Sequence, residues 1–410
     1  MAKISPFRAI RPTRDKVHLV AAKPVYTYKK IVLEAKLVDN PFTFLHIVSP
    51  DFGNNSSTKL SGEERFNLIS ERYQAFIDNG VFIQDEVPTL YIYRQTQKRG
   101  TFTGVICGAS IDEYKEGLIK KHEATITSRE ELFTNYLNVV GYNAEPVLLS
   151  HSPSAQISEL IEKCTDDRAE YEFSTTDLIK HELWPLSTSN AQLVQAAFEK
   201  IPELYIADGH HRSASSVGLT DTRCSNEVNY ANEKNFLAYL IDENQLQIVE
   251  FNRLVKSLNG YSPDELLDAL SSKFTIKEIE QARNPLSEHE ITVCMKGKWY
   301  TMSCMKHIID LDHPVKCLDA EILTEHILTP LLGIQDLKLS KDILFMSGAE
   351  PLSKLENKVA FGDYAIAFVL YPITINQVKR VADNDLIMPP KSTWVEPKLR
   401  SGLTIYNINE

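Results

Sequence analysis

The sequence has few cysteines, no long apolar run and no excess of basic residues. Its six cysteines are scattered along 410 residues without a CxxC pair, which argues against a zinc ribbon and against a disulfide framework. The longest apolar run, "YAIAFVLYPI" from residue 364, is about half as long as a membrane-spanning helix. The first ten residues, "MAKISPFRAI", lack the apolar core of a signal peptide. We therefore expect a cytoplasmic protein with no membrane partner.

The net negative charge of the chain argues against a nucleic-acid partner. The chain has 44 lysines and arginines against 55 aspartates and glutamates, a formal net charge of -11. A protein that binds a nucleic acid along its backbone needs a concentrated basic face to neutralise phosphates. We therefore expect no nucleic-acid partner, and any site for an anion must be local.

Local patterns indicate a mixed fold. Ser-x-x-Glu boxes predict helix starts, because the serine oxygen and the glutamate carboxylate satisfy backbone amides of the first turn; they are Ser61 with Glu64, Ser128 with Glu131, and Ser262 with Glu265. The first of these helices should end at Asn79-Gly80. Residues with β preference follow, in "TLYIYRQ", "FTGVICG", the paired runs "FLAYLI" and "LQIVEF", and the hairpin "ITVCM-KGK-WYTM". These elements give an α+β fold class.

The length indicates two domains. We place the break after the strand "LQIVEF", so that residues 1–251 form the first domain and residues 252–410 a second, smaller α+β domain whose tail folds back on the site. The second domain contains the amphipathic "DAEILTEHILTPLLGI", whose apolar stripe indicates packing or dimerisation. The turn-rich "SPDFGNNSSTKLSGEE" from residue 49 is predicted as a surface loop.

The stretch "LYIADGHHRSAS", residues 204–215, carries the strongest chemical signal. Its apolar start and its small residues predict a strand-to-helix turn. A glycine lets the backbone bend or approach a ligand, and the amides and dipole of the helix start attract an anion. An arginine fits phosphate oxygens with two parallel donors. The expected phosphate-binding residues are Gly209, His211, Arg212 and Ser213, and the expected catalytic residues are Asp208 and His210.

Two other interpretations of this stretch stay open. Asp-Gly is an ordinary turn, and the histidines can be satisfied residues of a helix start. Zinc is disfavoured, because adjacent histidines rarely point at one metal and no His-x-x-x-His spacing accompanies them. We predict no protein-bound metal site.

The stretch resembles the signature of the ParB/sulfiredoxin-like superfamily, whose members bind nucleotide phosphates with a Gly-x-x-Arg box at a helix start; free serine kinases carry a related box. By this resemblance Gly209, His211 and Arg212 match the phosphate-binding positions. His210 stands where sulfiredoxin has its reactive cysteine, so sulfur chemistry is not expected. The resemblance implies a ParB/sulfiredoxin-like, mixed α/β nucleotide-binding domain.

The whole chain resembles one large family of that group, the domain-of-unknown-function family 1015. Six separated pieces carry the resemblance: "ISPFRAIRP", "NPFTFLHIVSPDF", "GLIKKHEATITSREELF", "LW" at 183, "YIADGHHRSAS" and "MPPKSTWVEPKLRSGL". One departure stands out. The family has Pro-Tyr-Asp-Val near the start, where this chain has "AAKPVYTYKK".

Secondary candidates lie elsewhere. In "KKHEAT", His122 and Glu123 precede a predicted helix and are expected to act as base or cation ligand, although a solvated charge cluster explains them equally. In "PPKST", Lys391 is expected to contact phosphate, but no glycine-rich cradle accompanies it and an ordered proline turn is the alternative. His181, beside Trp184, is predicted as a core residue.

Together these features predict a nucleotide-dependent phosphotransferase of kinase type, with an amino acid among the candidate acceptors. The expected cofactor is ATP, ADP or CTP with Mg²⁺, and the expected partner a small-molecule substrate. Alternatives are a non-catalytic nucleotide switch that closes a homodimer, a phosphohydrolase or nuclease that uses the two histidines, and a scaffold without chemistry.

Overall fold

The computed structural model describes residues 2–52, 60–224 and 230–410. They form two compact units. The first comprises Met1–Lys120, Thr125–Leu246 and Pro397–Glu410, and the second Lys121–Ala124 and Gln247–Glu396. The last fourteen residues of the chain therefore belong to the first unit.

A mixed sheet is the centre of the first unit; over the described residues it has nine strands. Eight follow one another in the order β6, β11, β8, β12, β5, β4, β10, β9, and β1 pairs with β5 beside them. Only β11 with β6 and β12 with β8 run parallel among the described pairs. The strands are β1 (Ile4–Ser5), β4 (Tyr91–Gln97), β5 (Gly100–Ser110), β6 (Ile119–Lys120), β8 (Val147–His151), β9 (Tyr171–Ser174), β10 (Lys180–Pro185), β11 (Leu204–Asp208) and β12 (Asn235–Asp242).

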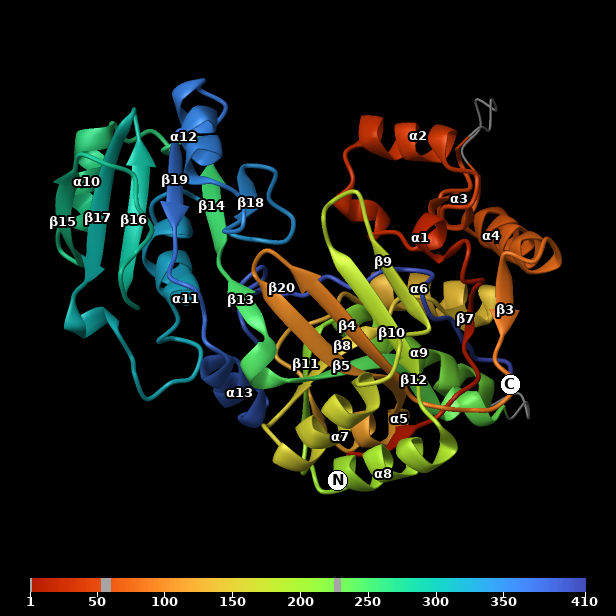
Figure 1. The fold of residues 1–410 in the computed structure, drawn as a ribbon. Coiled ribbons are helices and arrows are strands. Elements are labelled where there is room, and N and C mark those ends of the chain that lie inside the picture. The colour runs from red at the N-terminus through yellow and green to blue at the C-terminus, as the bar shows by residue number, and fades with distance from the viewer. Residues whose placement is uncertain (1, 53–59, 225–229) are drawn as a thin grey trace. The chain divides into compact units, whose positions relative to one another are not determined.

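Helices and two short strand pairs surround this sheet (Figure 1). The helices are α1 (Val17–Val20), α2 (Lys30–Asp39), α3 (Leu45–Val48), α4 (Gly62–Asp78), α5 (Ile111–Lys115), α6 (Thr127–Val140), α7 (Ala155–Thr165), α8 (Thr188–Phe198) and α9 (His210–Cys224). Short 3-10 turns are η1 (Val25–Thr27), η2 (Ala231–Lys234) and η3 (Glu243–Gln245). The strand pairs join β2 (Ile10–Pro12) to β3 (Phe82–Gln84), and β7 (Tyr142–Asn143) to β21 (Tyr406–Asn407).

The two faces of the sheet differ in what covers them. One face forms the main core with α7 and α8, because alternate strand residues such as Ile92, Val105 and Leu149 are apolar and fully buried. The other face carries tyrosines and is covered by the C-terminal segment, where Tyr406 lies against Gly108 of β5. Burial on both faces fixes the register of the strands, because a slip by one residue would exchange the faces.

The second unit is a six-stranded sheet in the order β15, β17, β16, β19, β14, β18, visible in Figure 1. Its strands are β14 (Phe251–Val255), β15 (Phe274–Ile279), β16 (Glu290–Met295), β17 (Lys298–Cys304), β18 (Ile343–Ser347) and β19 (Ile366–Val369), with β13 (Gln247–Val249) paired to β20 (Trp394–Glu396). Its helices are α10 (Pro263–Leu270), α11 (Asp319–Leu323), α12 (Leu352–Ala360) and α13 (Ile375–Asp383), with η4 (Lys306–Ile308) and the π-helical η5 (Thr324–Leu328). The apolar stripe of α11 and η5 is packed in this unit's core.

The structure confirms the mixed α/β character and most predicted element starts. Both sides of the capping box are present at Ser61 and at Ser262, and Gly80 has the left-handed φ of +63°. The helix predicted at Ser128 is present, but its capping box is absent. Helix α6 begins at Thr127 and its N-cap, Ile126, has no side-chain hydrogen bond, so Ser128 lies inside the first turn, too late to cap it.

One strand prediction is confirmed and another is wrong. The hairpin of β16 and β17 is confirmed, with Lys296 and Gly297 both at positive φ in a tight turn. The pairing of "FLAYLI" with "LQIVEF" is wrong, because β12 pairs with β5 and β8 while β13 pairs with β20. Residues 53–59 of the predicted loop from residue 49 lie outside the described residues.

Two negative findings apply to the described part of the chain. None of its helices combines the length and the apolar composition that a membrane span requires. Its cysteines at positions 107, 164, 294, 304 and 317 form no disulfide.

Candidate functional site

The stretch from residue 204 to 215 forms the predicted strand-to-helix turn. Strand β11 ends at Asp208, helix α9 begins at His210, and Gly209 joins them with φ +108°. The register of β11 against β8 shifts between Ile206 and Asp208, and such a bulge re-aims the side chain that follows it. Asp208 is therefore displaced from the regular alternation of the strand.

Gly209 is required for two reasons. Its positive φ is a conformation that side chains rarely adopt. A β-carbon at this position would also lie 2.9 Å from Nε and from Nη2 of Arg212, so the guanidinium lies directly over the glycine. The helix continues from this point, because the Gly209 carbonyl accepts a hydrogen bond from the Ser213 amide at 3.1 Å. The turn thus presents an arginine and a helix start at one place.

Arg212 lies between two carboxylates. Its Nη1 donates to Oε2 of Glu145 at 3.2 Å, and its Nη2 lies 3.7 Å from Oδ2 of Asp208. A second cation shares Asp208, since Nζ of Lys398 donates to the same Oδ2 at 3.1 Å. Two positive and two negative side chains therefore alternate around the turn.

These contacts shift the acid-base properties of the turn. Burial alone would raise the pKa of Asp208, but Lys398 and Arg212 outweigh it and lower that pKa below its usual value. Burial would lower the pKa of Arg212, and the charges of Asp208 and Glu145 reverse this and raise it. Asp208 is therefore a carboxylate, and Arg212 a cation, at every physiological pH.

Glu145, Lys398 and Ser401 belong to the cluster, and sequence reasoning did not select them. Ser401 donates its hydroxyl to Oε1 of Glu145 at 2.7 Å, which orients that carboxylate toward Arg212. Lys398 and Ser401 stand in the C-terminal piece "MPPKSTWVEPKLRSGL". Basic and hydroxyl residues within that piece were the signal that could have identified Lys398 and Ser401, whereas Glu145 had no such signal.

The first half of α9 packs closely, as its small residues predicted. Ser213, Ser215 and Ser216 are buried, and their hydroxyls donate to carbonyls three or four residues earlier in the helix. Helix α6 lies against α9, where a β-carbon on Gly218 would be 2.8 Å from Oγ1 of Thr134. This packing holds the start of α9 in place; His210 is buried within it.

A largely apolar cavity of about 360 Å³ adjoins the turn. Arg212, Ser215 and Glu145 contribute to its wall. The remaining wall is mainly aromatic and aliphatic, from α3, α4, α6 and β7 and the residues beside them: Phe44, Val48, Gly62, Arg65, Phe66, Ile69, Leu132, Phe133, Tyr136, Leu137, Tyr142, Asn143 and Ala144. The first unit thus places a charged cluster beside a pocket for an apolar or flat group.

Three predicted residues lie in the second unit. His122 is buried, and its carbonyl accepts a hydrogen bond from the Met388 amide at 2.9 Å. Glu123 follows it on the same short segment. Lys391 has φ +57°, and its Nζ lies 5.5 Å from the centre of the Phe251 ring. The structure therefore brings together Asp208, Gly209, Arg212 and Ser213 in the first unit, and their relation to these three residues stays a prediction.

Within the described residues, no group of three or more histidines, cysteines, aspartates or glutamates is arranged to hold a metal ion. The nearest arrangement in the site is the pair of carboxylates, Asp208 and Glu145, on either side of Arg212. A divalent cation at this turn would take its other ligands from a bound substrate or from water.

Comparison with known proteins identifies the family. Residues 4–321 match the family described as "Protein of unknown function (DUF1015)", and the chain belongs to that family. No curated protein matches the sequence.

Three similar solved structures are remote in sequence. A free serine kinase in complex with AMP is 13% identical, with 73% of this chain and 91% of the kinase covered and a TM-score of 0.36. A conserved hypothetical protein from Pyrococcus furiosus is 14% identical over 74% and 95% of the two chains, with a TM-score of 0.36. SbnI with a C-terminal truncation, from Staphylococcus aureus, is 11% identical over 73% and 87%, with a TM-score of 0.38.

Proposed function

We propose that this member of the DUF1015 family is a nucleotide-dependent phosphotransferase that acts on a small metabolite, with its nucleotide phosphates at the turn between β11 and α9. We also propose that the first unit is a ParB/sulfiredoxin-like domain. The observation that carries the proposal is Arg212 lying over Gly209 at the start of α9, with Lys398 beside it.

The turn supplies the groups that phosphates need. The first turn of a helix directs backbone N–H groups and the positive end of its dipole outward, toward the preceding loop. Arg212 adds a planar pair of donors, and Lys398 adds a point charge. Gly209 leaves room for the Arg212 guanidinium over the backbone, where a side chain would displace it.

In this proposal Asp208 and Glu145 act first as counter-ions and then as groups that face Mg²⁺. With no ligand bound, Asp208 and Glu145 balance the charges of Lys398 and Arg212. When phosphate oxygens take over the two cations, the carboxylates can face Mg²⁺ that arrives with the nucleotide; bound there, the ion would neutralise charge that develops on the phosphates. Asp208, a carboxylate at neutral pH, is then placed to accept a proton from an acceptor hydroxyl.

The adjoining cavity gives room for the organic part of a ligand. The rings of Phe66 and Tyr136 pack edge to face, with centres 5.5 Å apart and planes at 77°. Either ring can offer a face to a flat base. Arg212 belongs both to the turn and to the cavity wall. A molecule with an anionic end and a flat end would therefore fit the two parts of the site together.

The remaining roles follow the sequence predictions. In this proposal His211 assists phosphate binding directly and Ser213 assists it by holding the turn, through its bonds to the carbonyls of Gly209 and His210. His210 donates a proton to a bridging or leaving oxygen. His122 and Glu123 stay proposed catalytic groups, and Lys391 a proposed phosphate contact. ATP, ADP and CTP are the candidate nucleotides.

The test is calorimetric titration of the full-length protein with ATP, ADP and CTP in the presence of Mg²⁺. We expect micromolar binding of at least one nucleotide and a loss of tenfold or more in Arg212→Ala. Arg283→Ala is the matched control, because Arg283 also pairs with a glutamate, Glu290, and is similarly exposed. Absence of binding by every nucleotide, or an equal effect of both substitutions, would refute the proposal.

Chemistry is tested separately from binding. The protein is incubated with radiolabelled nucleotide and a metabolite extract, and phosphorylated small molecules are sought by chromatography. Transfer of label to a small acceptor supports the phosphotransferase. Release of inorganic phosphate alone identifies a hydrolase, and nucleotide-driven dimerisation without turnover identifies a switch.

A further inference from the structure

On the sheet face that α7 covers, five neighbouring strands change from apolar to polar side chains at the same position along the strands. The strands are β4, β5, β8, β10 and β12. On β4 the row runs from Ile92 to Arg94 and Thr96, and each neighbouring strand makes a matching change. The polar residues are Thr101 and Thr103 of β5, His151 of β8, Lys180 and Glu182 of β10, and Asp242 of β12. A face that buries the core at one end therefore ends in a polar surface at the other.

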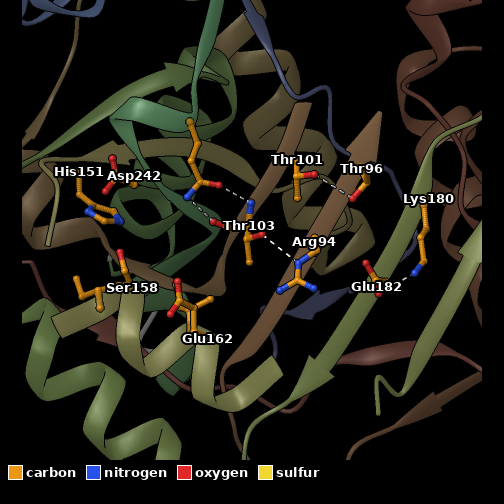
Figure 2. Close-up of a pocket in the computed structure, with 13 residues that line it drawn as sticks. Arg94, Thr96, Thr101, Thr103, His151, Ser158, Glu162, Lys180, Glu182 and Asp242 are labelled. Atoms are coloured by element: carbon orange, nitrogen blue, oxygen red, sulfur yellow. Dashed lines mark hydrogen bonds and ion pairs between the residues drawn. The ribbon is translucent and has the colours of Figure 1, made fainter. Parts of the chain in front are cut away.

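These residues line a cavity of about 590 Å³, which Ser158 and Glu162 of α7 border (Figure 2). It lies away from the turn at Gly209. Strand β8 runs antiparallel to β11, so that Asp208 lies opposite Leu148, whereas His151 is at the other end of β8. The cavity is a separate site within the same unit.

Arg94 is the fixed cation of this cavity. Its Nε donates to Oγ1 of Thr103 at 3.2 Å, and its Nη2 donates to Oγ1 of Thr165 at 3.0 Å. Its guanidinium also lies 5.0 Å from the ring of Trp184. Two hydroxyls and one aromatic ring thus hold the group in one orientation, while Nη1 makes no hydrogen bond to any described residue.

No carboxylate of the described residues lies within 4.0 Å of the Arg94 guanidinium. Glu182 is its direct partner across β4 and β10, yet Glu182 binds Lys180 at 3.0 Å, and Lys180 also binds Glu172 at 2.8 Å. A half-buried arginine without a counter-ion is costly unless a ligand supplies one. The arrangement therefore indicates an anionic group beside Arg94.

The rest of the wall limits what that anion can be. The lining carries two cations, Arg94 and Lys180, against three carboxylates, Glu162, Glu182 and Asp242. This excess of negative charge disfavours a doubly charged phosphate. It favours hydrogen-bond donors on the ligand, because carboxylates accept hydrogen bonds. His151 adds an acceptor: its Nδ1 donates to the Ser152 carbonyl at 2.9 Å, leaving Nε2 as the accepting nitrogen.

We propose that this cavity is a second ligand site, which binds a small organic monocarboxylate that also carries hydroxyl groups. The carboxylate lies on Arg94 and the hydroxyls on the acidic and threonine side chains of the wall. The site is independent of the nucleotide site proposed above.

The test is calorimetric titration of the full-length protein with gluconate, acetate, sorbitol and inorganic phosphate. We expect gluconate to bind at least tenfold more tightly than each of the other three, because only gluconate has one carboxylate and several hydroxyls. Absence of gluconate binding, equal binding of sorbitol, or tighter binding of phosphate would overturn the proposal.

Variants locate the site. Arg94→Gln should weaken gluconate binding at least tenfold, whereas Arg14→Gln, a surface arginine of the same unit that pairs with Glu170, should not. Ser158→Trp is a second test that does not disturb the core, because Ser158 is exposed on α7. The indole would occupy part of the cavity that Ser158 borders. Arg212→Ala should leave gluconate affinity unchanged. Unchanged affinity in both cavity variants would exclude this cavity as the site.

Discussion

Nζ of Lys398 lies 3.1 Å from Oδ2 of Asp208, although 190 positions separate the two residues in the chain. This ion pair joins the C-terminal segment to the turn before α9, and with Ser401 and Glu145 it completes the charged cluster around Arg212. The proposed phosphate site therefore depends on the C-terminal segment as well as on the turn. A truncation that removed only the last fourteen residues would remove one of its two cations.

Replacing Lys398 tests this dependence. Lys398→Met should lower nucleotide affinity about tenfold or more, because a charge-assisted hydrogen bond is worth roughly 1.5–3 kcal/mol. It should also raise the pKa of Asp208, since Lys398 is the main group that lowers it. Calorimetry measures the affinity. The control is Lys115→Met, which removes another lysine-aspartate pair, with Asp221, on the surface of the same unit; an equal loss there would contradict the prediction.

Substitution of Gly209 tests whether the turn needs a residue that tolerates positive φ. Gly209→Ala should destabilise the protein by about 1–3 kcal/mol, because alanine is strained at a φ of +108°, and it should displace Arg212 and weaken nucleotide binding. Urea denaturation gives the free energy of unfolding. Gly62→Ala is the control: Gly62 opens helix α4, nothing lies within 4 Å of its added β-carbon, and alanine there should be neutral or stabilising by up to about 1 kcal/mol. A neutral Gly209→Ala would show that the turn tolerates a side chain.

The apolar cavity beside Arg212 allows a test of whether the nucleotide base binds there, separately from the phosphates. Phe66→Ala should lower ATP affinity several-fold, because a stacking contact is worth about 1–3 kcal/mol. Binding of inorganic pyrophosphate, which lacks a base, should stay the same. Competition titrations with both ligands measure this. Phe361→Ala, at an exposed phenylalanine of α12's end, is the control. A parallel loss for ATP and pyrophosphate would place the base elsewhere.

Local chemistry explains why the turn could be predicted from sequence. A strand of apolar residues, a glycine and a run of serines specify β11, Gly209 and α9 within a dozen residues, and each signal depends only on nearby positions. The capping boxes at Ser61 and Ser262 succeeded for the same reason. The box at Ser128 failed, because helix α6 starts two residues earlier than the motif requires.

Long-range contacts were beyond sequence reasoning. No spacing rule connects Lys398 or Glu145 to Arg212, because tertiary folding alone brings them together. The pairing of β13 with β20 in place of β12 has the same origin. The polar end of the sheet around Arg94 was not predicted, because its cavity exists only where five strands are in register.

His181 is a core residue, as predicted, and its hydrogen bonds fix its tautomer. It is fully buried. Arg400 Nε, which can only donate, lies 3.3 Å from Nε2, so Nε2 accepts and Nδ1 carries the proton. Nδ1 then donates to the hydroxyl of Tyr93 at 2.7 Å. Burial and the charge of Arg400 lower the pKa of His181 to about 3, because a second proton would face the guanidinium.

This neutral histidine predicts how stability depends on pH. The unfolded chain binds a proton to His181 below about pH 6.5, whereas the folded protein does not until about pH 3. The contribution of His181 to stability is therefore complete above pH 6.5 and is lost as the pH falls, by about 2 kcal/mol at pH 5. Urea denaturation at pH 7 and pH 5 measures the difference for the wild type and for His181→Gln, which should be less stable at pH 7 but should lose less stability on acidification. His18→Gln, at an exposed position, should retain the full dependence, and an unchanged dependence in His181→Gln would show that other groups cause it.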